Sequence, residues 1–360
     1  MVSELSQRGI EFGFATSDDA AAMVNFHNAY YGTERKPEHW LWEYKTYKPD
    51  KSVFAFARDH ERIIATQAII PVYLEVGAEL VLSGKSENSL LLPPYRGSGI
   101  MPSLYEHAVK NCIDRGIQFL WGFTAAAKLS KKFTYYPIAQ IMMRPGNIWI
   151  DAVSRLRDKS PLWRRIGSVG KLILKSAFKK HAYSGPNIQE KPRYEVKKGK
   201  MCDEKQLQSL YQRLKETYGN IIYIRLDREY LKWRVREHPF VKYDEYQVYQ
   251  NRELCAYAFV AMFGGVAAVS DLTSEDTYAT SILLKTIIKD YAKKAGRIQF
   301  LGNSEDLLAQ DLFNQLGQFG FSAYDTWRFG IRDLAGGRFK EILDVSNWHT
   351  NGLWTEGYSM

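Results

Sequence analysis

The chain has few cysteines, few histidines and no long apolar run. Its 360 residues include three cysteines and seven histidines. The cysteines form no CxxC pair and the histidines form no HxxxH pair, which argues against a disulfide framework, a zinc ribbon and a metal centre. No stretch of 18 apolar residues suits a membrane span. The first residues, with Glu4 and Arg8, do not resemble a secretion signal, so we expect a cytoplasmic protein without a metal.

The positive charge is confined to one segment. The formal net charge is +9. Residues 151–200 hold 14 lysines and arginines against four acidic residues, so this segment contributes +10 and the other 310 residues contribute −1. Because the rest of the chain has no basic excess, the charge does not by itself indicate a nucleic-acid partner, and we expect none. The chain also lacks a GxSxG motif, which argues against a serine hydrolase.

Two parts of the chain share one order of features. WLWEYKTYKP at 40–49 and YLKWRVREHP at 230–239 place an aromatic residue and a proline at the same spacing. Each is followed by strand-like alternation, then a helix, then a strand that contains IQFL, at 117–120 and at 298–301. Two copies indicate a duplicated domain rather than a repeat array.

We therefore predict an α/β (α+β) fold of two similar domains, each a mixed, mostly antiparallel sheet flanked by helices. The expected boundaries are residues 1–152 for the first domain, 153–200 for a basic linker without apolar strands, and 201–360 for the second domain. Within the linker, alternating apolar and basic residues predict an amphipathic helix at 162–181. This helix either packs across the halves or lies on an anionic membrane surface, and RNA binding is a third interpretation.

The most informative segment is PPYRGSGI at 93–100. It follows a predicted strand that ends in three leucines and precedes a predicted helix. Gly97 and Gly99 permit positive φ and let a ligand approach the backbone closely. Amide groups at the start of a helix attract anions, and Arg96 adds a positive charge. The segment predicts a pyrophosphate site, with a tight turn that binds nothing as the alternative; it lacks the Lys-Ser/Thr pair of a P-loop.

PPYRGSGI resembles the acyl-CoA pyrophosphate loop of the GNAT (Gcn5-related) N-acyltransferase superfamily, which reads Gln/Arg-x-x-Gly-x-Gly/Ala. Gly97 and Gly99 match its small positions, and Pro94 stands where Gln or Arg is usual. GIQFLWGF and KLSKKFTYYPI resemble the family's next strand and the helix after it. The resemblance implies coenzyme A, as acyl-CoA, for the donor substrate. The residues expected to contact it are Leu91, Leu92, Arg96, Gly97, Ser98, Gly99, Ile100 and Lys131.

The second half departs from this pattern. A shift of 181 residues moves the two glycines onto Tyr278 and Thr280. By the same resemblance, we expect this half to bind no coenzyme A. It would instead shape the acceptor pocket near the junction of the halves or stabilise the first half.

Amine acylation needs a neutral amine and a polarised thioester carbonyl. The family's usual carbonyl donor is a backbone amide on the strand before the loop, here Leu90–Leu92. Glu87, on the same strand, is our candidate base, with a sugar contact or a structural role as alternatives. Ser86 and Asn88 are candidate substrate contacts, and strand alternation predicts these two on one face and Glu87 on the other. His27, on a predicted first helix, is the candidate histidine, with a structural role as the alternative.

The family's usual acid is a tyrosine on the helix after the next strand. Phe133 stands at that position, and Tyr135 and Tyr136 lie off register. Tyr136 is retained as a candidate substrate contact. A thiol with a pKa near 8.5 can leave without a dedicated acid.

The whole layout resembles bacterial tandem-GNAT enzymes of surface-polysaccharide pathways, most of all the dTDP-3-amino-3,6-dideoxyhexose N-acyltransferases. The resemblance implies a nucleotide-linked amino sugar as acceptor, in O-antigen or capsule synthesis. Two alternatives stay open: an aminoacyl transferase that uses charged tRNA, and a non-catalytic binding or membrane-associated protein with a relic fold. A homo-oligomer would fit how common symmetric oligomers are.

Overall fold

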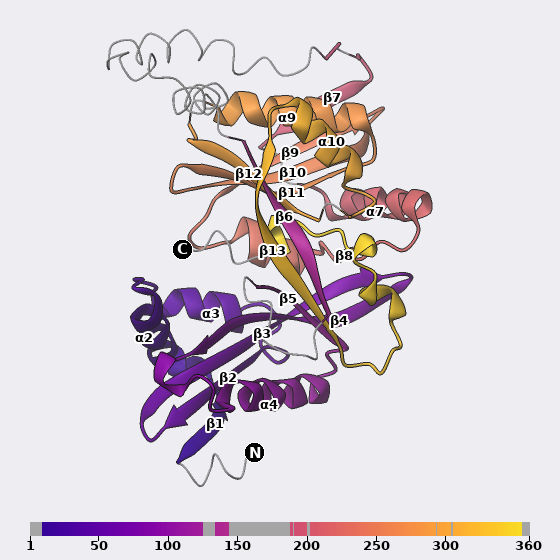
Figure 1. The fold of residues 1–360 in the computed structure, drawn as a ribbon. Coiled ribbons are helices and arrows are strands. Elements are labelled where there is room, and N and C mark those ends of the chain that lie inside the picture. Colours follow the sequence, from indigo (N-terminus) through magenta and orange to yellow (C-terminus); the bar gives the residue numbers. More distant parts are fainter. Residues whose placement is uncertain are drawn as a thin grey trace, which may run out of the picture.

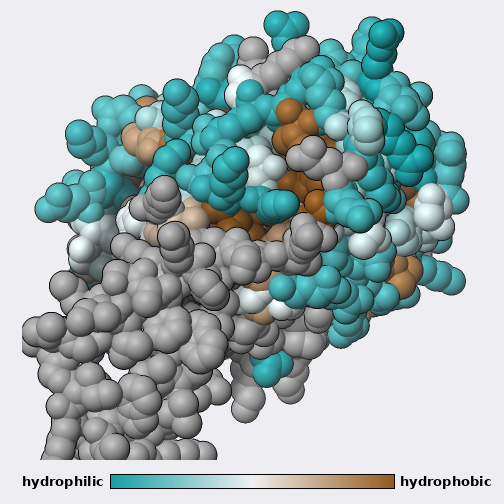
Figure 2. All heavy atoms as spheres, turned by 90° about the horizontal axis from the view of Figure 1, so that it is seen from above, coloured by the Kyte–Doolittle hydropathy of each residue, from teal (hydrophilic) through white to brown (hydrophobic). Residues whose placement is uncertain are grey.

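A computed structural model describes residues 9–124, 134–143, 188–189, 191–199, 202–292, 294–303 and 305–354. The chain forms two α/β lobes, the first in indigo to magenta and the second mostly in orange (Figure 1). Seen from above the second lobe, the described surface is mostly hydrophilic, with hydrophobic side chains in a few places (Figure 2). Within these ranges no helix is both long and apolar enough to cross a membrane.

The first half begins with a strand and two helices and continues with a meander of strands. Its strands are β1 (Ile10–Phe14), β2 (Val53–Asp59), β3 (Arg62–Val76), β4 (Glu79–Leu91), β5 (Phe119–Thr124) and β6 (Thr134–Met143). Its helices are α2 (Ala20–Tyr31), α3 (Pro37–Lys45) and α4 (Ile100–Asp114), with short 3-10 turns η1 (Ser17–Asp19) and η2 (Pro93–Tyr95). The strands and helices that the sequence predicts between residues 20 and 124 are confirmed.

The second half repeats this order. Its strands are β7 (Tyr194–Lys198), β8 (Tyr223–Ile224), β9 (Tyr243–Gln250), β10 (Glu253–Phe263), β11 (Val266–Ser274), β12 (Arg297–Gly302) and β13 (Ser322–Asp333). Its helices are α7 (Glu204–Tyr218), α8 (Arg228–Leu231), the π-helical turn η4 (Lys232–Arg236), α9 (Thr277–Tyr291) and α10 (Gln310–Gln318). Three 3-10 turns close the described chain: η5 (Lys340–Leu343), η6 (Val345–Asn347) and η7 (Gly352–Trp354).

The described strands join into one mixed sheet of 13 strands that runs through both lobes. Its order is β1-β2-β3-β4-β5-β13-β6-β12-β11-β10-β9-β7, with β8 beside β3. Two of the strand pairs, β4 with β5 and β11 with β12, are parallel, and the other pairs in this sheet are antiparallel. This confirms the predicted α/β architecture of mixed, mostly antiparallel strands flanked by helices.

The two halves exchange strands at the junction. β13 of the second half pairs with β5 of the first, with Ile331 opposite Trp121, and β6 of the first half pairs with β12 of the second, with Ile141 opposite Phe300 (Figure 1). The Arg332 guanidinium on β13 also forms a bidentate ion pair with a carboxylate on α4, with both N–O distances at 3.0 Å. Each half therefore completes the sheet of the other.

One prediction about secondary structure is wrong. The predicted helix KLSKKFTYYPI is a strand over its last five residues, because Thr134–Met143 form β6. Pro137 is unsuited to a helix interior because it lacks an amide hydrogen. β6 pairs with β12 only from Ala139 onward, so the strand edge that faces β12 has no partner at Pro137 and tolerates a proline there. The predicted linker at 153–200 contains one mostly polar strand, because Tyr194–Lys198 pair with β9 at the edge of the sheet. The predicted helix at 162–181 lies outside the described residues.

The two repeated segments meet each other at the junction. The indole Nε1 of Trp42 donates to the carbonyl of Trp233 at 3.2 Å, and the indole Nε1 of Trp233 donates to the carbonyl of Trp42 at 2.9 Å. The ring of Tyr47 stacks on Trp233 with centroids 4.8 Å apart. One hydrophobic core runs through this contact and includes side chains of both halves. The repeat seen in the sequence is thus an interface in the fold.

Candidate active site

The glycine-rich loop lies between β4 and α4 of the first half. Gly97 and Gly99 have φ of 80° and 82°, in the left-handed region where a side chain is strained. Gly99 caps the N-terminus of α4, so the first amides of that helix have no carbonyl partner within it. A Cβ on Gly97 would meet no atom within 4 Å. Within this segment the amide of Ser98 donates to the carbonyl of Tyr95 at 3.3 Å and the amide of Ile100 donates to the Ser98 hydroxyl at 3.5 Å. The amides that suit an anion are therefore those of Gly97 and Gly99.

Side chains of two other elements hold this loop. Arg96 is exposed, and its guanidinium donates to the hydroxyl of Tyr30 on α2 at 3.1 Å. The hydroxyl of Tyr95 donates to Asp59 at the end of β2 at 2.6 Å, and this hydrogen bond is the main cause that raises the pKa of Tyr95. The loop is therefore anchored on both sides, while its positive charge stays accessible to solvent.

β4 and β5 separate close to this loop. They pair at only two positions, Gly84 with Leu120 and Lys85 with Trp121, whereas the other edge of β5 pairs with β13 along its whole length. A Cβ on Gly84 would lie 2.5 Å from a side-chain carbon of Ile69, so the tight end of the pair requires glycine. The last six residues of β4 are left with one unpaired edge that faces the gap between the strands.

The amide of Leu91 points into this gap. The amide of Leu92 donates to the carbonyl of Ile64 on β3 at 2.9 Å, so it is used within the sheet. Successive amides of a strand point to opposite edges, which directs the amide of Leu91 away from β3. Among the leucines predicted to polarise the thioester carbonyl, Leu91 thus has the required direction and Leu92 does not.

The prediction that Ser86 and Asn88 share a face is wrong. The pairing of β3 and β4 shifts between Thr66 and Ala68, and Asn88 has a positive φ of 50°, which marks a β-bulge. The hydroxyl of Ser86 lies 3.3 Å from the Tyr105 hydroxyl on α4, whereas Asn88 reaches across to α3 on the other side of the sheet. The extra residue of the bulge reverses the alternation on which the prediction depended.

Glu87 is buried and pairs with Lys85 on the same face of β4. Glu87 is 8% exposed and Lys85 is 7% exposed, and their side chains form an ion pair. A buried carboxylate is stable only with such compensation. Lys85 was not predicted from the sequence, although it lies two residues before Glu87 and therefore on the same face of the strand.

A small pocket, partly open to solvent and with a cavity volume of about 10 Å³, lies at the junction, where β4 and β5 begin to separate. This is room for about one water molecule. The first half contributes Glu43, Ile70, Val72, Lys85 and Trp121, and the second half contributes Tyr230, Trp233, Arg234 and Leu353. Three of these side chains carry charge and are buried. The carboxylate of Glu43 forms an ion pair with the guanidinium of Arg35 at 3.0 Å. The guanidinium of Arg234 lies 5.9 Å from the ring centroid of Trp233. No local sequence pattern marks Glu43 or Arg234.

His27 lies on α2, as predicted, but does not line this pocket. Its Nδ1 lies 3.3 Å from the hydroxyl of Thr33, and its Nε2 lies 3.5 Å from a guanidinium nitrogen of Arg35. Because Arg35 binds Glu43, His27 is linked to the pocket wall through one side chain. This position favours a supporting role.

Several predictions fall outside what the structure describes. Lys131 lies outside the described residues, and the side chain of Tyr136 does as well, although its backbone belongs to β6.

Cys112 is fully buried on α4, and burial raises the pKa of its thiol to about 12, which makes it a poor nucleophile. Within the described part of the chain, no group of three or more histidine, cysteine or acidic side chains could hold a metal ion.

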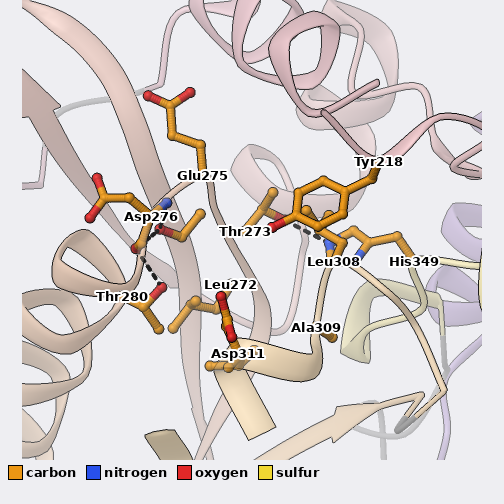
Figure 3. Close-up of a pocket in the computed structure, with 12 residues that line it drawn as sticks. Tyr218, Leu272, Thr273, Glu275, Asp276, Thr280, Leu308, Ala309, Asp311 and His349 are labelled. Atoms are coloured by element: carbon orange, nitrogen blue, oxygen red, sulfur yellow. Dashed lines mark hydrogen bonds between the residues drawn. The ribbon is translucent and has the colours of Figure 1, made fainter. Parts of the chain in front are cut away.

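The second half has a carboxylate where the first half has its glycine loop. Asp276 caps α9, and its side chain accepts from the amide of Ala279 at 2.8 Å. An acidic cap occupies the amides that an anion would use and repels a pyrophosphate. A small pocket at this place, with a cavity volume of about 20 Å³, is lined by Thr273, His349 and the acidic side chain of Glu275, among others (Figure 3). The expectation that this half has no coenzyme A cradle fits this arrangement.

Comparisons with known proteins agree with this geometry. Residues 11–138 match the family described as Acetyltransferase (GNAT) domain. A structure from Enterococcus faecalis V583, a conserved protein of unknown function named as a probable N-acyltransferase, has a TM-score of 0.62 at 9% identity and covers 91% of this chain and 73% of its own. No curated protein matches the sequence.

Two further structures share the fold over both halves. A GCN5-related N-acetyltransferase from Anabaena variabilis has a TM-score of 0.59 at 12% identity, over 90% of this chain and 72% of its own. An N-myristoyltransferase from Saccharomyces cerevisiae with bound myristoyl-CoA has a TM-score of 0.58 at 13% identity, over 90% of this chain and 79% of its own. At such identities the likeness shows the fold alone. Residues 11–138 are thus similar to a GNAT acetyltransferase domain, and the second half repeats the fold of the first without its glycine loop.

Proposed function

We propose that the protein is an acyl-CoA-dependent N-acyltransferase. The observation that carries this proposal is the alignment of three features of the first half. The amides of the loop at Gly97–Gly99 suit a pyrophosphate, the gap between β4 and β5 suits an extended thiol-bearing arm, and the buried junction pocket lies where that gap narrows. A donor bound along this line would present its thioester between the loop and the pocket.

The proposed reaction is direct attack of an amine on the thioester. A bond forms between the amine nitrogen and the acyl carbon, and the bond from that carbon to sulfur breaks. The ammonium form of the acceptor first loses a proton to a base, and a second proton is lost from nitrogen as the intermediate collapses. That proton can go to the departing thiolate, because a thiol has a pKa near 8.5.

We assign the base to Glu87 and the carbonyl donor to the amide of Leu91. Glu87 is buried near the junction pocket and shares its face of β4 with Lys85, a pocket residue. Loss of a proton from an ammonium group to this carboxylate, directly or through water, is within the range of general base catalysis. The Leu91 amide points into the gap where the thioester would lie. In known oxyanion sites one such donor stabilises the transition state by about 3 kcal/mol.

We infer that the acceptor is a nucleotide-linked amino sugar, with a dTDP-3-amino-3,6-dideoxyhexose of surface-polysaccharide synthesis as the first candidate. The tandem layout supports this, and aromatic side chains meet buried charges at the junction pocket, a combination that a polar ring at its open side could contact. Asn88 and Tyr136 remain proposed substrate contacts. Ser86 is directed to α4 and His27 acts through Arg35, so we propose supporting roles for both.

The test is a free-thiol assay with acetyl-CoA and longer acyl-CoA donors against amino-sugar nucleotides. We expect thiol release that depends on the acceptor, and a loss of about 100-fold or more in kcat for Glu87→Gln. The matched control is Glu79→Gln on the same strand, where the side chain is exposed and pairs with Arg338. Equal rates in both variants would remove Glu87 from the mechanism.

The basic segment at 151–200 favours one second candidate, an aminoacyl transferase that uses charged tRNA. The same protein would then release no thiol from any acyl-CoA and would bind tRNA with an affinity that falls steeply with salt. These two results together would replace the first proposal.

A further inference from the structure

The last described part of the chain, residues 345–354, lies between two strands of the second half. β11 and β12 pair over only four residues and then separate. Beyond that point Thr273 on β11 contacts His349, and a Cβ on Gly302 of β12 would lie 3.7 Å from the carbonyl oxygen of Thr350. In the first half the matching gap is the proposed place of the acyl donor. In the second half the protein's own chain fills it.

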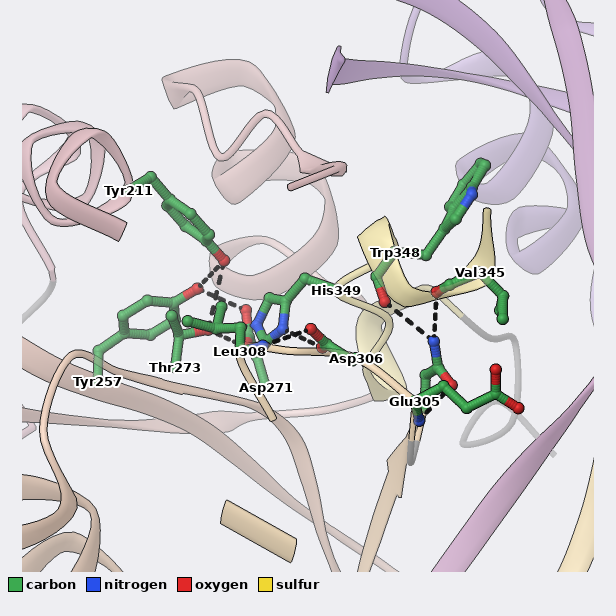
Figure 4. Close-up of polar contacts among 11 residues, drawn as sticks. Tyr211, Tyr257, Asp271, Thr273, Glu305, Asp306, Leu308, Val345, Trp348 and His349 are labelled. Atoms are coloured by element: carbon green, nitrogen blue, oxygen red, sulfur yellow. Dashed lines mark hydrogen bonds and ion pairs between the residues drawn. The ribbon is translucent and has the colours of Figure 1, made fainter. Parts of the chain in front are cut away.

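A buried polar network fixes this segment at His349 (Figure 4). Its Nδ1 lies 2.7 Å from Asp306, which follows β12, and its Nε2 lies 2.9 Å from the Thr273 hydroxyl on β11. Thr273 donates to Asp271 at 3.0 Å, and Tyr257 on β10 donates to the other oxygen of Asp271 at 2.7 Å. His349 is therefore hydrogen-bonded directly to β11 and to the residues after β12, and it is linked to β10 through Thr273, Asp271 and Tyr257.

The charges of this network support a doubly protonated histidine. Burial by itself would lower the pKa of His349, but the adjacent Asp306 carboxylate, its hydrogen bond and the charge of Asp271 outweigh burial and raise the pKa. With both ring nitrogens protonated, His349 donates to Asp306 and to Thr273, and Thr273 remains free to donate to Asp271. Each polar group named here then has a partner.

The order Thr273–His349–Asp306 matches a nucleophile, a base and an orienting acid, but the site does not suit covalent catalysis. Thr273 is 1% exposed, so a substrate carbonyl has no access to its oxygen. Its hydroxyl also binds Asp271, which competes with the histidine for the proton. The network therefore fixes the position of the segment that carries His349, and Thr273 does not act as a nucleophile.

The segment that His349 fixes goes on to form a wall of the junction pocket. The amide of Leu353 donates to the side chain of Asn351 at 3.0 Å, and Leu353 lines the pocket. The carbonyl of Leu353 accepts from Arg234 at 3.4 Å. The ring of Trp354 packs on Trp121 of β5 with centroids 4.7 Å apart. Four to five residues after His349, the chain thus touches the first half at the proposed acceptor site.

We propose that His349 is a positioning residue for acceptor binding: by fixing residues 349–354 between β11 and β12, it sets the wall of the junction pocket. Its loss is expected to weaken acceptor binding and to leave binding of coenzyme A at the first-half loop unchanged. The inference rests on the proposed function, because it takes the junction pocket as the acceptor site.

The experiment compares the native protein with His349→Asn and with the control His60→Asn. His60 is an exposed histidine on the turn between β2 and β3, with 87% of its side chain exposed. For each protein we would measure the KM for a dTDP-3-amino-3,6-dideoxyhexose, the KM for acetyl-CoA and the amide hydrogen exchange of residues 349–354. We expect His349→Asn to raise the acceptor KM on the order of 10-fold, or ~1.4 kcal/mol, with the acetyl-CoA KM within about twofold.

Hydrogen exchange separates failure of this inference from failure of the proposed function. Faster exchange at 349–354 together with a change in the acceptor KM alone is the expected result. Unchanged exchange, or equal changes in both KM values, would overturn the positioning role. If the native protein releases no thiol with any acceptor, the proposed function fails, while the exchange of residues 349–354 still shows whether His349 holds this wall.

Discussion

Removal of the Trp233 side chain should destabilise the whole protein. The indole is 7% exposed, stacks on Tyr47 and donates to the carbonyl of Trp42. Replacement of a buried tryptophan by alanine costs ~3–5 kcal/mol, which includes the lost contacts and the cavity left behind. We expect Trp233→Ala to lower the free energy of unfolding by this amount. Trp233→Phe keeps most of the ring and loses one hydrogen bond, so it should cost about 1 kcal/mol from that bond plus a smaller packing loss.

Urea unfolding followed by tryptophan fluorescence and by far-ultraviolet circular dichroism measures this effect. Because β6 and β13 cross between the halves, both probes should report one coincident transition in the native protein and in the variant. Phe240→Ala is the control, since Phe240 is 41% exposed at the same junction and should cost much less. A loss below about 1 kcal/mol for Trp233→Ala, or two transitions of which only one moves, would refute the reasoning.

Three further predictions concern single side chains. Glu87→Gln should lower kcat and leave coenzyme A affinity within about twofold, measured by calorimetry; a matching fall in affinity would show that Glu87 supports the donor site. Asp276→Ala should cost about 1 kcal/mol in urea unfolding through loss of the α9 cap and should create no coenzyme A binding; new binding in the second half would contradict the reading of that cap. Asp271→Asn should reduce the pH dependence of stability. Burial raises the pKa of Asp271 to about 6, so the folded state holds its proton more tightly, and the free energy of unfolding should fall as pH rises from about 4 to 6. A native protein whose stability falls no more steeply than that of Asp271→Asn over this range would contradict it.

Much of the fold follows from local signals in the sequence. Alternation over β2, β3, β9 and β10 marks half-buried or buried strands, and the glycine loop before α4 stands out because positive φ requires glycine. The loss of the loop in the second half is also visible, since Tyr278 and Thr280 stand in place of its glycines. These features depend on neighbours within one element.

The exchange of β6 and β13 between the two halves could not be predicted from local signals in the sequence. Pairing between Trp121 and Ile331 joins residues about 200 positions apart, and neither strand carries a mark of its partner. The bulge at Asn88 is a second case, because one extra residue reverses the faces of a strand and nothing in the sequence around it demands the extra residue.

The charged residues of the junction pocket were missed for a similar reason. Glu43 and Arg234 lie on helical segments where a charge is usually solvated, and only the packing of the two repeated segments buries them. Glu87 was named as a candidate because it lies on the strand before the loop, whereas its ion-pair partner Lys85 on the same face was not considered. A pocket between two halves is a property of their contact rather than of either sequence.

The central claim, that acyl-CoA binds at the loop of the first half, is tested most directly by calorimetric titration with coenzyme A. The native protein is compared with Gly97→Glu and Gly116→Glu. Both glycines have positive φ and open space around them, and they lie at opposite ends of α4, so the second variant controls for backbone strain and added charge. We predict binding by the native protein and by Gly116→Glu, and a loss of about 100-fold or more for Gly97→Glu, whose carboxylate would face the pyrophosphate. No binding by the native protein, or equal binding by all three, would contradict the account.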